Sequence, residues 1–154
     1  MAVDLVRLKS FLAEANLAGY ATGAENSFIK ETDGSKTIVF VDGDWGFNDN
    51  YFGGEPYGGR EVVSYQGKPV FIMVYYGQVK SFVDKEMVYD FLRQALKSFP
   101  AEMPLRGPSE LVDSMLRYEN KWIGDITKFS GQEKIFFDGE EAYQANYLGG
   151  LVDQ

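Results

Sequence analysis

Aromatic side chains that end in a polar atom are the most usable chemical signal in this sequence. The chain contains 10 tyrosines and 2 tryptophans, and each such ring needs a hydrogen-bond partner when it is buried. Several of these rings together would make a good pocket for a planar or cationic ligand. We predict a ligand-binding cleft formed by Trp45, Tyr51, Tyr75, Trp122 and Tyr147, with Glu55 and Arg106 as polar anchors. Ordinary core packing is the alternative for each ring, and an ion pair that ties down a loop is the alternative for Arg106.

Carboxylates offer a second chemistry. Glu55 and Glu61 flank a glycine-rich stretch, and two carboxyl groups held about 5 to 9 Å apart hydrolyse glycosidic bonds in many enzymes. Nothing in the spacing enforces that separation, so exposed loop carboxylates are the simpler interpretation. The acidic stretch from Asp42 to Asp49 lacks the ligand spacing and the closing glutamate of an EF-hand. We therefore predict no catalytic residue, no metal and no cofactor.

The residue types that are missing exclude several mechanisms. The 154-residue chain has no cysteine and no histidine, which removes thiolate nucleophiles, Ser-His-Asp triads and zinc sites built from nitrogen and sulfur ligands. A net charge of −8 repels phosphate backbones and acidic membranes, so we expect no direct nucleic-acid binding and no membrane binding. Charges interrupt the segment 1–17, which leaves no signal-peptide stretch and predicts a cytoplasmic protein. The same charge suits a basic protein partner, although solubility alone explains it.

Two amphipathic helices are expected to position the candidate residues. The first runs from Leu5 to about Leu17 with Asp4 as its N-cap, and its apolar residues recur at helical spacing. The second follows the N-cap Asp84 and carries an apolar stripe as far as Phe99. A hydrophobic content of 45% predicts a packed core around them.

The sequence after the first helix recurs, more faintly, after the second. Gly67 and Tyr75 return as Gly139 and Tyr147 at one constant spacing, whereas Trp45 and Trp122 are related by a wider one. The wider spacing would mean extra residues in the loop 55–60 of the first copy. We predict an α+β fold made of tandem duplicated helix-plus-antiparallel-meander units, with a curved antiparallel sheet and two main helices. The chain would be a single domain, 1–154, with internal halves of about 4–82 and 84–152.

Hairpin dipeptides predict where the strands turn. Asp42–Gly43, Gln66–Gly67 and Asp138–Gly139 are each typical of two-residue turns. Glu119–Asn120 is interpreted as the counterpart of Asp42–Gly43, because asparagine tolerates a left-handed conformation. A strand over 121–129 would follow that turn.

The strand over 70–76 is apolar on both faces. Phe71, Met73 and Tyr75 form one face, which we expect to lie inside, and Val70, Ile72 and Val74 form the other. We expect the second face to be covered by a helix or by a partner. A protein-interaction role through this face is therefore an alternative to small-molecule binding.

Three segments together resemble a known family: DWGFNDNYFGGEPYGGREVVSYQGKPVFIMVYYGQV, MPLRGPSE and YLGGLV. They are similar to an uncharacterised bacterial domain family that occurs alone and also C-terminal to helix-turn-helix transcriptional regulators of the phage-repressor class. The likeness covers most of the chain from about Leu8 onward. No helix-turn-helix lies in this sequence, so the resemblance implies a domain that senses a small molecule or a partner, and it implies no DNA contact.

The sequence thus favours a non-catalytic binding module of undetermined specificity, such as an effector-binding domain for a small planar or cationic ligand. An acidic protein-interaction or inhibitor protein is the alternative. A carboxylate-dependent hydrolase is the third interpretation, and it would require Glu55 or Glu61 to lie inside a cleft beside a second carboxyl group.

Overall fold

The computed structural model describes residues 2–19 and 28–153. These residues form two α-helices and a nine-stranded antiparallel sheet. The helices are α1 (Leu5–Ala18) and α2 (Lys85–Leu96). The strands are β1 (Ile29–Lys30), β2 (Lys36–Asp42), β3 (Trp45–Gly53), β4 (Tyr57–Tyr65), β5 (Lys68–Val79), β6 (Glu110–Asp113), β7 (Leu116–Asp125), β8 (Lys128–Phe137) and β9 (Glu140–Leu151). The expected α+β class, with an antiparallel sheet and two helices, is confirmed.

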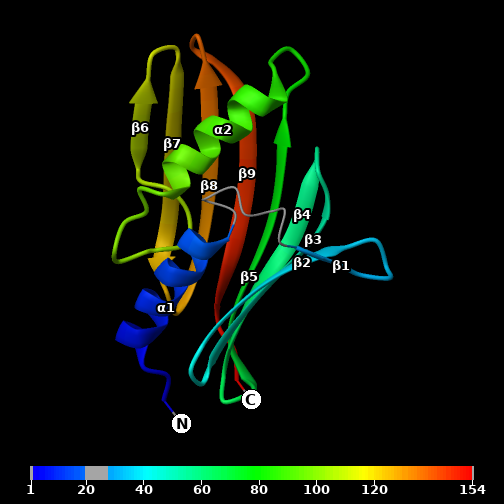
Figure 1. The fold of residues 1–154 in the computed structure, drawn as a ribbon. Coiled ribbons are helices and arrows are strands. Elements are labelled where there is room, and N and C mark those ends of the chain that lie inside the picture. Colours follow the sequence, from blue (N-terminus) through cyan, green and yellow to red (C-terminus); the bar gives the residue numbers. More distant parts are fainter. Residues whose placement is uncertain (1, 20–27, 154) are drawn as a thin grey trace.

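The strand order places the two halves of the chain side by side. It runs β1-β2-β3-β4-β5-β9-β8-β7-β6, so the last strand of each meander, β5 or β9, lies at the centre and pairs with the other. Tyr75 is directly opposite Tyr147 in that central pair. The sheet is open, and both helices lie on the same face of it (Figure 1). Side chains on that face therefore point toward the helices.

The helices begin where the sequence predicts them to begin. The Asp4 carboxylate accepts a hydrogen bond from the Arg7 amide at 3.0 Å, and the Asp84 carboxylate accepts one from the Glu86 amide at 3.0 Å. Each bond satisfies an amide that has no partner within the helix. The second helix ends at Leu96, earlier than expected, because the chain tightens into a turn there and the Ser98 amide bonds to the Ala95 carbonyl.

Each helix buries its apolar stripe against a different part of the sheet. Phe11 and Leu12 of α1 belong to a core cluster that includes Phe47, Val63 and Phe71. Leu92 and its neighbours on α2 belong to a second cluster, which rests on β7, β8 and β9. The removal of this apolar surface from water is the main stabilising contribution of both helices.

The expected turn at Glu119–Asn120 is wrong. Asn120 lies in the middle of β7, fully paired in the ladder, and it is buried. The turn lies instead at 114–115, where Ser114 takes the positive φ of 57° that Gly43 takes in the first half. A serine in a left-handed conformation gives no sequence signal, because glycine and asparagine are the residues that usually mark one.

The proposed correspondence between Trp45 and Trp122 is also wrong. Trp45 lies opposite Tyr65, near the beginning of β3, whereas Trp122 lies opposite Gly131, near the end of β7. Residues 57–60 are part of β4 and do not belong to an extra loop. The first half therefore does not contain the insertion that the wider spacing would require.

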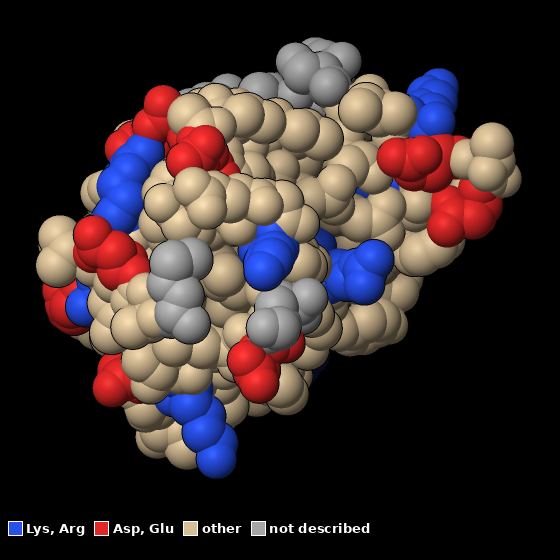
Figure 2. Space-filling view, turned by 90° about the horizontal axis from the view of Figure 1, so that it is seen from below, with Lys and Arg blue, Asp and Glu red and all other residues tan. Residues whose placement is uncertain are grey.

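The surface carries both signs of charge. Seen from below, acidic and basic side chains are interspersed between uncharged ones over the described part of this face (Figure 2). The net charge of −8 is therefore not concentrated in one acidic patch there.

Candidate functional site

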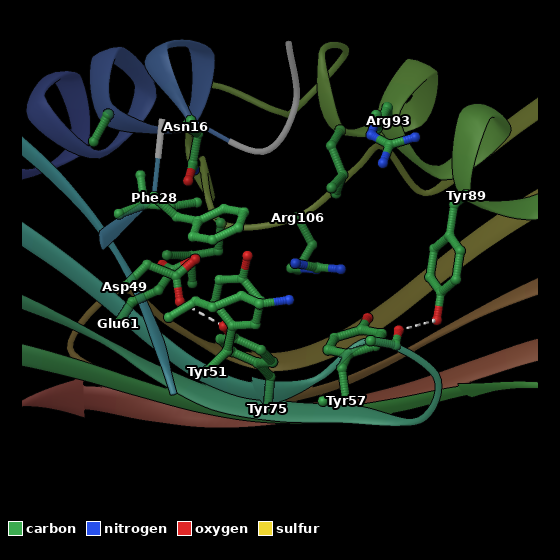
Figure 3. A pocket seen from close by; sticks show the side chains of 18 of the residues that line it. Asn16, Phe28, Asp49, Tyr51, Tyr57, Glu61, Tyr75, Tyr89, Arg93 and Arg106 are labelled. Atoms are coloured by element: carbon green, nitrogen blue, oxygen red, sulfur yellow. Dashed lines mark hydrogen bonds between the residues drawn. The ribbon is translucent and has the colours of Figure 1, made fainter. Parts of the chain in front are cut away.

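A cavity of about 360 Å³ lies between the two helices and the first half of the sheet. Its floor consists of side chains from β2, β3, β4 and β5, and its walls come from α1, from α2 and from the loop that contains Leu105 and Arg106. Figure 3 shows acidic, basic and aromatic side chains pointing into this space. A volume of this size suits a small organic molecule.

Two carboxylates occupy positions of the cavity floor where the strand pattern calls for apolar residues. Alternation along β3 puts Phe47, Asp49 and Tyr51 on the helix-facing side, and Glu61 of β4 is the direct partner of Asp49. Side chains in such a cross-strand pair have Cβ atoms about 4.5–5.5 Å apart. Both residues are buried, with Asp49 9% and Glu61 5% exposed. The pattern of the strands thus brings together two acidic groups that are remote in sequence.

Glycine at position 59 lets Tyr75 reach Asp49. Gly59 pairs with both Tyr51 and Tyr75, and a Cβ atom there would lie 2.7 Å from the Tyr75 hydroxyl oxygen. Because that space is free, the tyrosine ring extends across β4 and its hydroxyl donates a hydrogen bond to Asp49 Oδ1. Gly59 is therefore required for a close approach of side chain to backbone, and not for a turn.

Burial changes the charge state of the carboxyl pair. Burial raises the pKa of Asp49 to about 6, although the Tyr75 hydrogen bond and Arg106 oppose the shift. Burial and the neighbouring Asp49 charge raise the pKa of Glu61 to about 8, again against Arg106. Near neutral pH the pair therefore carries about one negative charge, which the two groups share.

Within the described part of the chain, Asp49 has a hydrogen-bond donor in Tyr75, whereas the buried Oε2 atom of Glu61 has no hydrogen-bond partner. The charge of Asp49 opposes the ionisation of Glu61. Buried carboxyl oxygens in proteins are almost always hydrogen-bonded. The unsatisfied oxygen of a side chain that lines a cavity is a feature that a bound ligand would explain.

Aromatic rings and a lysine form the rest of the lining. The Lys36 ammonium lies 5.1 Å from the Phe28 ring centre and 5.9 Å from that of Tyr51. The Tyr57 ring lies 5.9 Å from the Tyr75 ring, in a tilted arrangement. The cavity thus has flat apolar surfaces beside an acidic floor, a combination suited to a planar molecule that carries hydrogen-bond donors.

Four of the seven predicted site residues line the cavity. Tyr51 and Tyr75 present their rings to it. Glu55 lines its edge, where its carboxylate accepts hydrogen bonds from the Val79 amide at 2.7 Å and from the Tyr89 hydroxyl. Arg106 also lines it, paired with Glu133. The loop-anchoring alternative for Arg106 is the one that the structure bears out.

The other three predicted residues lie outside the cavity. Trp45 is a core residue whose ring packs on Phe11 at 5.7 Å. Trp122 is partly buried against the same core cluster. The Tyr147 hydroxyl donates a hydrogen bond to Asn120 at 2.7 Å, inside the protein. A pocket between the halves with the two tryptophans as counterparts is therefore not what the fold forms.

Sequence reasoning passed over the acidic floor. The sequence suggests Asp49 only as part of a failed calcium pattern, and Glu61 only as a loop carboxylate or as one candidate of a hydrolase that needs a second carboxyl group beside it. A signal was present, because Asp49 interrupts the alternating apolar face of Trp45, Phe47 and Tyr51. A polar residue on the inward face of a strand indicates either a buried network or a site.

The second half of the sheet holds a buried polar network in the corresponding region. The Arg106 Nε and Nη2 atoms both donate to Glu133 Oε1, the former at 3.0 Å. Tyr118 donates to Glu133 Oε2 at 2.6 Å, and Tyr143 donates to Oε1 at 3.1 Å. Glu133 is completely buried, so these donors replace its lost hydration.

The outer face of the sheet has no helix over it among the described residues. Val74 is 39% exposed and pairs with Leu148, which is 58% exposed. Ile72 on the same face is half-buried, whereas Val70, at the bulge of the β4–β5 pair, packs against the core cluster that contains Phe47. The expectation that a helix covers this face is wrong, because both helices pack on the opposite one (Figure 1).

The described residues contain no cluster of three or more acidic, histidine or cysteine side chains arranged to hold a metal ion. Neither α1 nor α2 combines the length and apolar character needed to cross a bilayer.

Fold and site together define an α+β protein in which one open antiparallel sheet and two helices enclose an acidic, aromatic cavity. The chain belongs to the family described as Domain of unknown function (DUF5680), which matches residues 49–152. Asp49, Glu61, Tyr75 and Glu133 all fall within the matched range, whereas α1, β1 and β2 precede it. No curated protein and no solved structure shows a significant match. Membership of an uncharacterised domain family is confirmed, and fusion to helix-turn-helix regulators stays a prediction.

Proposed function

We propose that this protein is a non-catalytic binding module that holds a small planar or cationic molecule in the cavity between its helices and the first half of its sheet. The observation that carries the proposal is Glu61, a buried carboxyl group that lines the cavity and has an oxygen to which no described residue donates a hydrogen bond. A ligand that donates hydrogen bonds there would remove an unfavourable burial, so binding and folding would support each other. Sensing of an effector is the role that the family resemblance suggests.

A fragment screen by thermal shift and ligand-observed NMR tests this proposal. Hits should bind the wild type. They should bind the Tyr51→Ala variant about tenfold more weakly, because the Tyr51 ring lines the cavity. Tyr76→Ala is the matched control, since Tyr76 is 56% exposed on the other face of the sheet. A screen without hits, or hits weakened equally by both substitutions, would exclude the cavity as the binding site.

A carboxylate-dependent hydrolase is the second candidate. Its support is that Glu61 lies in a cavity beside a second carboxyl group, although the partner is Asp49 and not Glu55. With pKa values raised to about 8 and about 6, largely by burial, Glu61 would be the proton donor and Asp49 the anionic partner near neutral pH. Turnover of 4-nitrophenyl glycosides that both Glu61→Gln and Asp49→Asn abolish would favour this function over simple binding.

A protein-interaction role is the third candidate. The exposed cross-strand neighbours Val74 and Leu148 support it, because they leave apolar surface on the outer face. The interspersed charges of Figure 2 give less support to an acidic inhibitor of a basic protein.

Duplication of one helix-plus-meander unit would account for the matching order of elements in the two halves. In support, a register shift follows Val63 in β4 and Ile135 in β8, and the glycines opposite Tyr75 and Tyr147 are Gly59 and Gly131. Recovery of one half by a profile built from homologues of the other would test this origin.

A further inference from the structure

Glu61 and Glu133 occupy matching places in the two halves of the sheet. Glu61 stands two residues after the glycine opposite Tyr75, and Glu133 stands two residues after the glycine opposite Tyr147. Each glutamate has an amide or carboxylate residue as its partner on the preceding strand, Asp49 or Asn120. The surroundings of one glutamate therefore indicate what the other requires.

Glu133 is bound by a guanidinium group. The loop between α2 and β6 supplies Arg106, whose planar head places two nitrogen donors on one carboxylate oxygen. The pair is 10% and 0% exposed, so the two charges neutralise each other inside the protein. Arg106 is able to do this because its planar head presents several donors at fixed angles.

No described residue donates a hydrogen bond to Glu61 Oε2, and Arg106 acts on Glu61 only through its charge. Phe47 lies opposite Val63 in the first half, and Tyr118 lies opposite Ile135 at the matching place in the second half. The first half therefore has a phenylalanine, without a hydroxyl donor, where the second half has a tyrosine. The linker between the first helix and β1, residues 20–27, has no lysine or arginine in its sequence. The cavity lies beside Glu61 on the helix-facing side of the sheet, the side from which Arg106 reaches Glu133.

We propose that the cavity takes a ligand with a guanidinium or amidinium group, which donates hydrogen bonds to Glu61 and Asp49 as Arg106 does to Glu133. This inference rests on the proposed binding function and names the chemical class of its ligand. Two adjacent carboxyl groups match the several donors of a planar cation better than the single centre of an alkyl ammonium. The rings of Tyr51 and Tyr75 line the same space and provide faces against which a planar cation stacks.

The other charged groups of the cavity limit where the cation can lie. Arg106 is paired with Glu133, but its charge still acts on Asp49 and Glu61, and Glu55 already accepts two hydrogen bonds. Lys36 from β2 and Lys85 and Arg93 from α2 line other parts of the cavity and repel a cation. The acidic floor formed by β3 and β4 is therefore the place for the cationic head, and any acidic group of the ligand belongs toward the lysines.

Three probes of nearly equal size test the inference: benzamidine, its neutral analogue benzamide and the alkyl amine benzylamine. Isothermal titration calorimetry at about pH 8, near the pKa of Glu61, should detect benzamidine and give about tenfold weaker binding for the other two. Affinity for benzamidine should fall as pH falls to about 5, because both carboxyl groups then become protonated.

Glu61→Gln keeps the size of the side chain and should weaken benzamidine binding about tenfold. Asp49→Asn, which introduces the residue type found at Asn120, is a second variant in case the first one folds poorly. Glu110→Gln alters an exposed residue of β6 and is the matched control.

Equal binding of benzamide and benzamidine would overturn the inference, as would benzamidine binding that neither cavity variant weakens. Failure of benzamidine to bind the wild type would also overturn it. None of these results bears on the wider proposal that the cavity binds a small molecule, because the fragment screen tests that proposal separately.

Discussion

The two halves of the sheet contain the same buried glutamate in different chemical settings. Glu133 accepts hydrogen bonds from Arg106, Tyr118 and Tyr143, whereas Glu61 has Asp49 beside it and an oxygen with no hydrogen-bond partner in residues 2–19 and 28–153. The first arrangement satisfies a buried charge within the chain, and the second leaves one for something else to satisfy. This fold therefore accommodates buried polar side chains in the interior of both halves. Among the described residues, only the buried glutamate of the second half is hydrogen-bonded to other side chains through both of its carboxylate oxygens.

The largest expected effect comes from replacing one of the two buried glutamates by glutamine. Glu133→Gln should lower the free energy of unfolding by about 3–5 kcal/mol, because it leaves the guanidinium of Arg106 buried without a charged partner. Urea unfolding monitored by tryptophan fluorescence measures the change. Glu119→Gln removes a carboxylate from the more exposed ion pair with Arg117 and should cost no more than about 1 kcal/mol. Equal losses in these two variants would mean that the buried network is not structural.

The same substitution in the first half should act in the opposite direction. The folded-state pKa is raised to about 8 for Glu61 and to about 6 for Asp49. Between the ordinary pKa of each carboxyl group and its raised value, the folded protein therefore binds more protons than the unfolded chain. The free energy of unfolding should therefore fall as pH rises from about 4 to about 8. Glu61→Gln removes the ionisation and should stabilise the protein by about 2–4 kcal/mol at pH 8.

Unfolding curves for the wild type and Glu61→Gln across this pH range give the test. The two proteins should be closest in stability at about pH 4 and below, where the wild-type Glu61 is mostly protonated in both the folded and the unfolded state. A parallel pH dependence of the two proteins would show that Glu61 ionises as freely in the folded state as in the unfolded one.

The smallest expected effect concerns a feature on which the two halves agree. Asp4→Ala and Asp84→Ala each remove a carboxylate that accepts a hydrogen bond from the first turn of a helix. Each substitution should lower the free energy of unfolding by about 1 kcal/mol, and the two losses should be equal. Thermal unfolding measures both, and Asp113→Ala, at an exposed position of β6, is a control that touches neither helix. A much larger loss for one cap would indicate that one helix anchors the fold more than the other.

Local features of the fold could be predicted from the sequence. Asp4 and Asp84 mark the helix starts because a short acidic side chain can satisfy a free amide within its own turn. The turns at Gln66–Gly67 and Asp138–Gly139 were predictable for a similar reason, since a glycine accepts the positive φ that a two-residue hairpin needs. Each of these depends on residues only a few positions apart.

The register of the second half could not be predicted in this way. Ser114 adopts a left-handed conformation with no side-chain preference to reveal it, and Asn120 looked like a turn residue although it is buried in a strand. Strand pairing with β8 fixed both outcomes, because a shift of one residue would have turned every inward side chain of β7 outward. Tertiary pairing thus overrode the local signals.

The sequence by itself determined the class of the fold, the two helices, the hairpin turns at Gln66–Gly67 and Asp138–Gly139 and the residue types available for chemistry, because these depend on neighbouring residues and on composition. Only the tertiary structure decided which of those residues meet. It brought Asp49 beside Glu61 and gave Glu133 the guanidinium of Arg106, while it sent Trp45 into the core. The physical reason is that cross-strand register and helix packing join positions far apart in the chain, and burial in that arrangement then sets the charge of each carboxyl group.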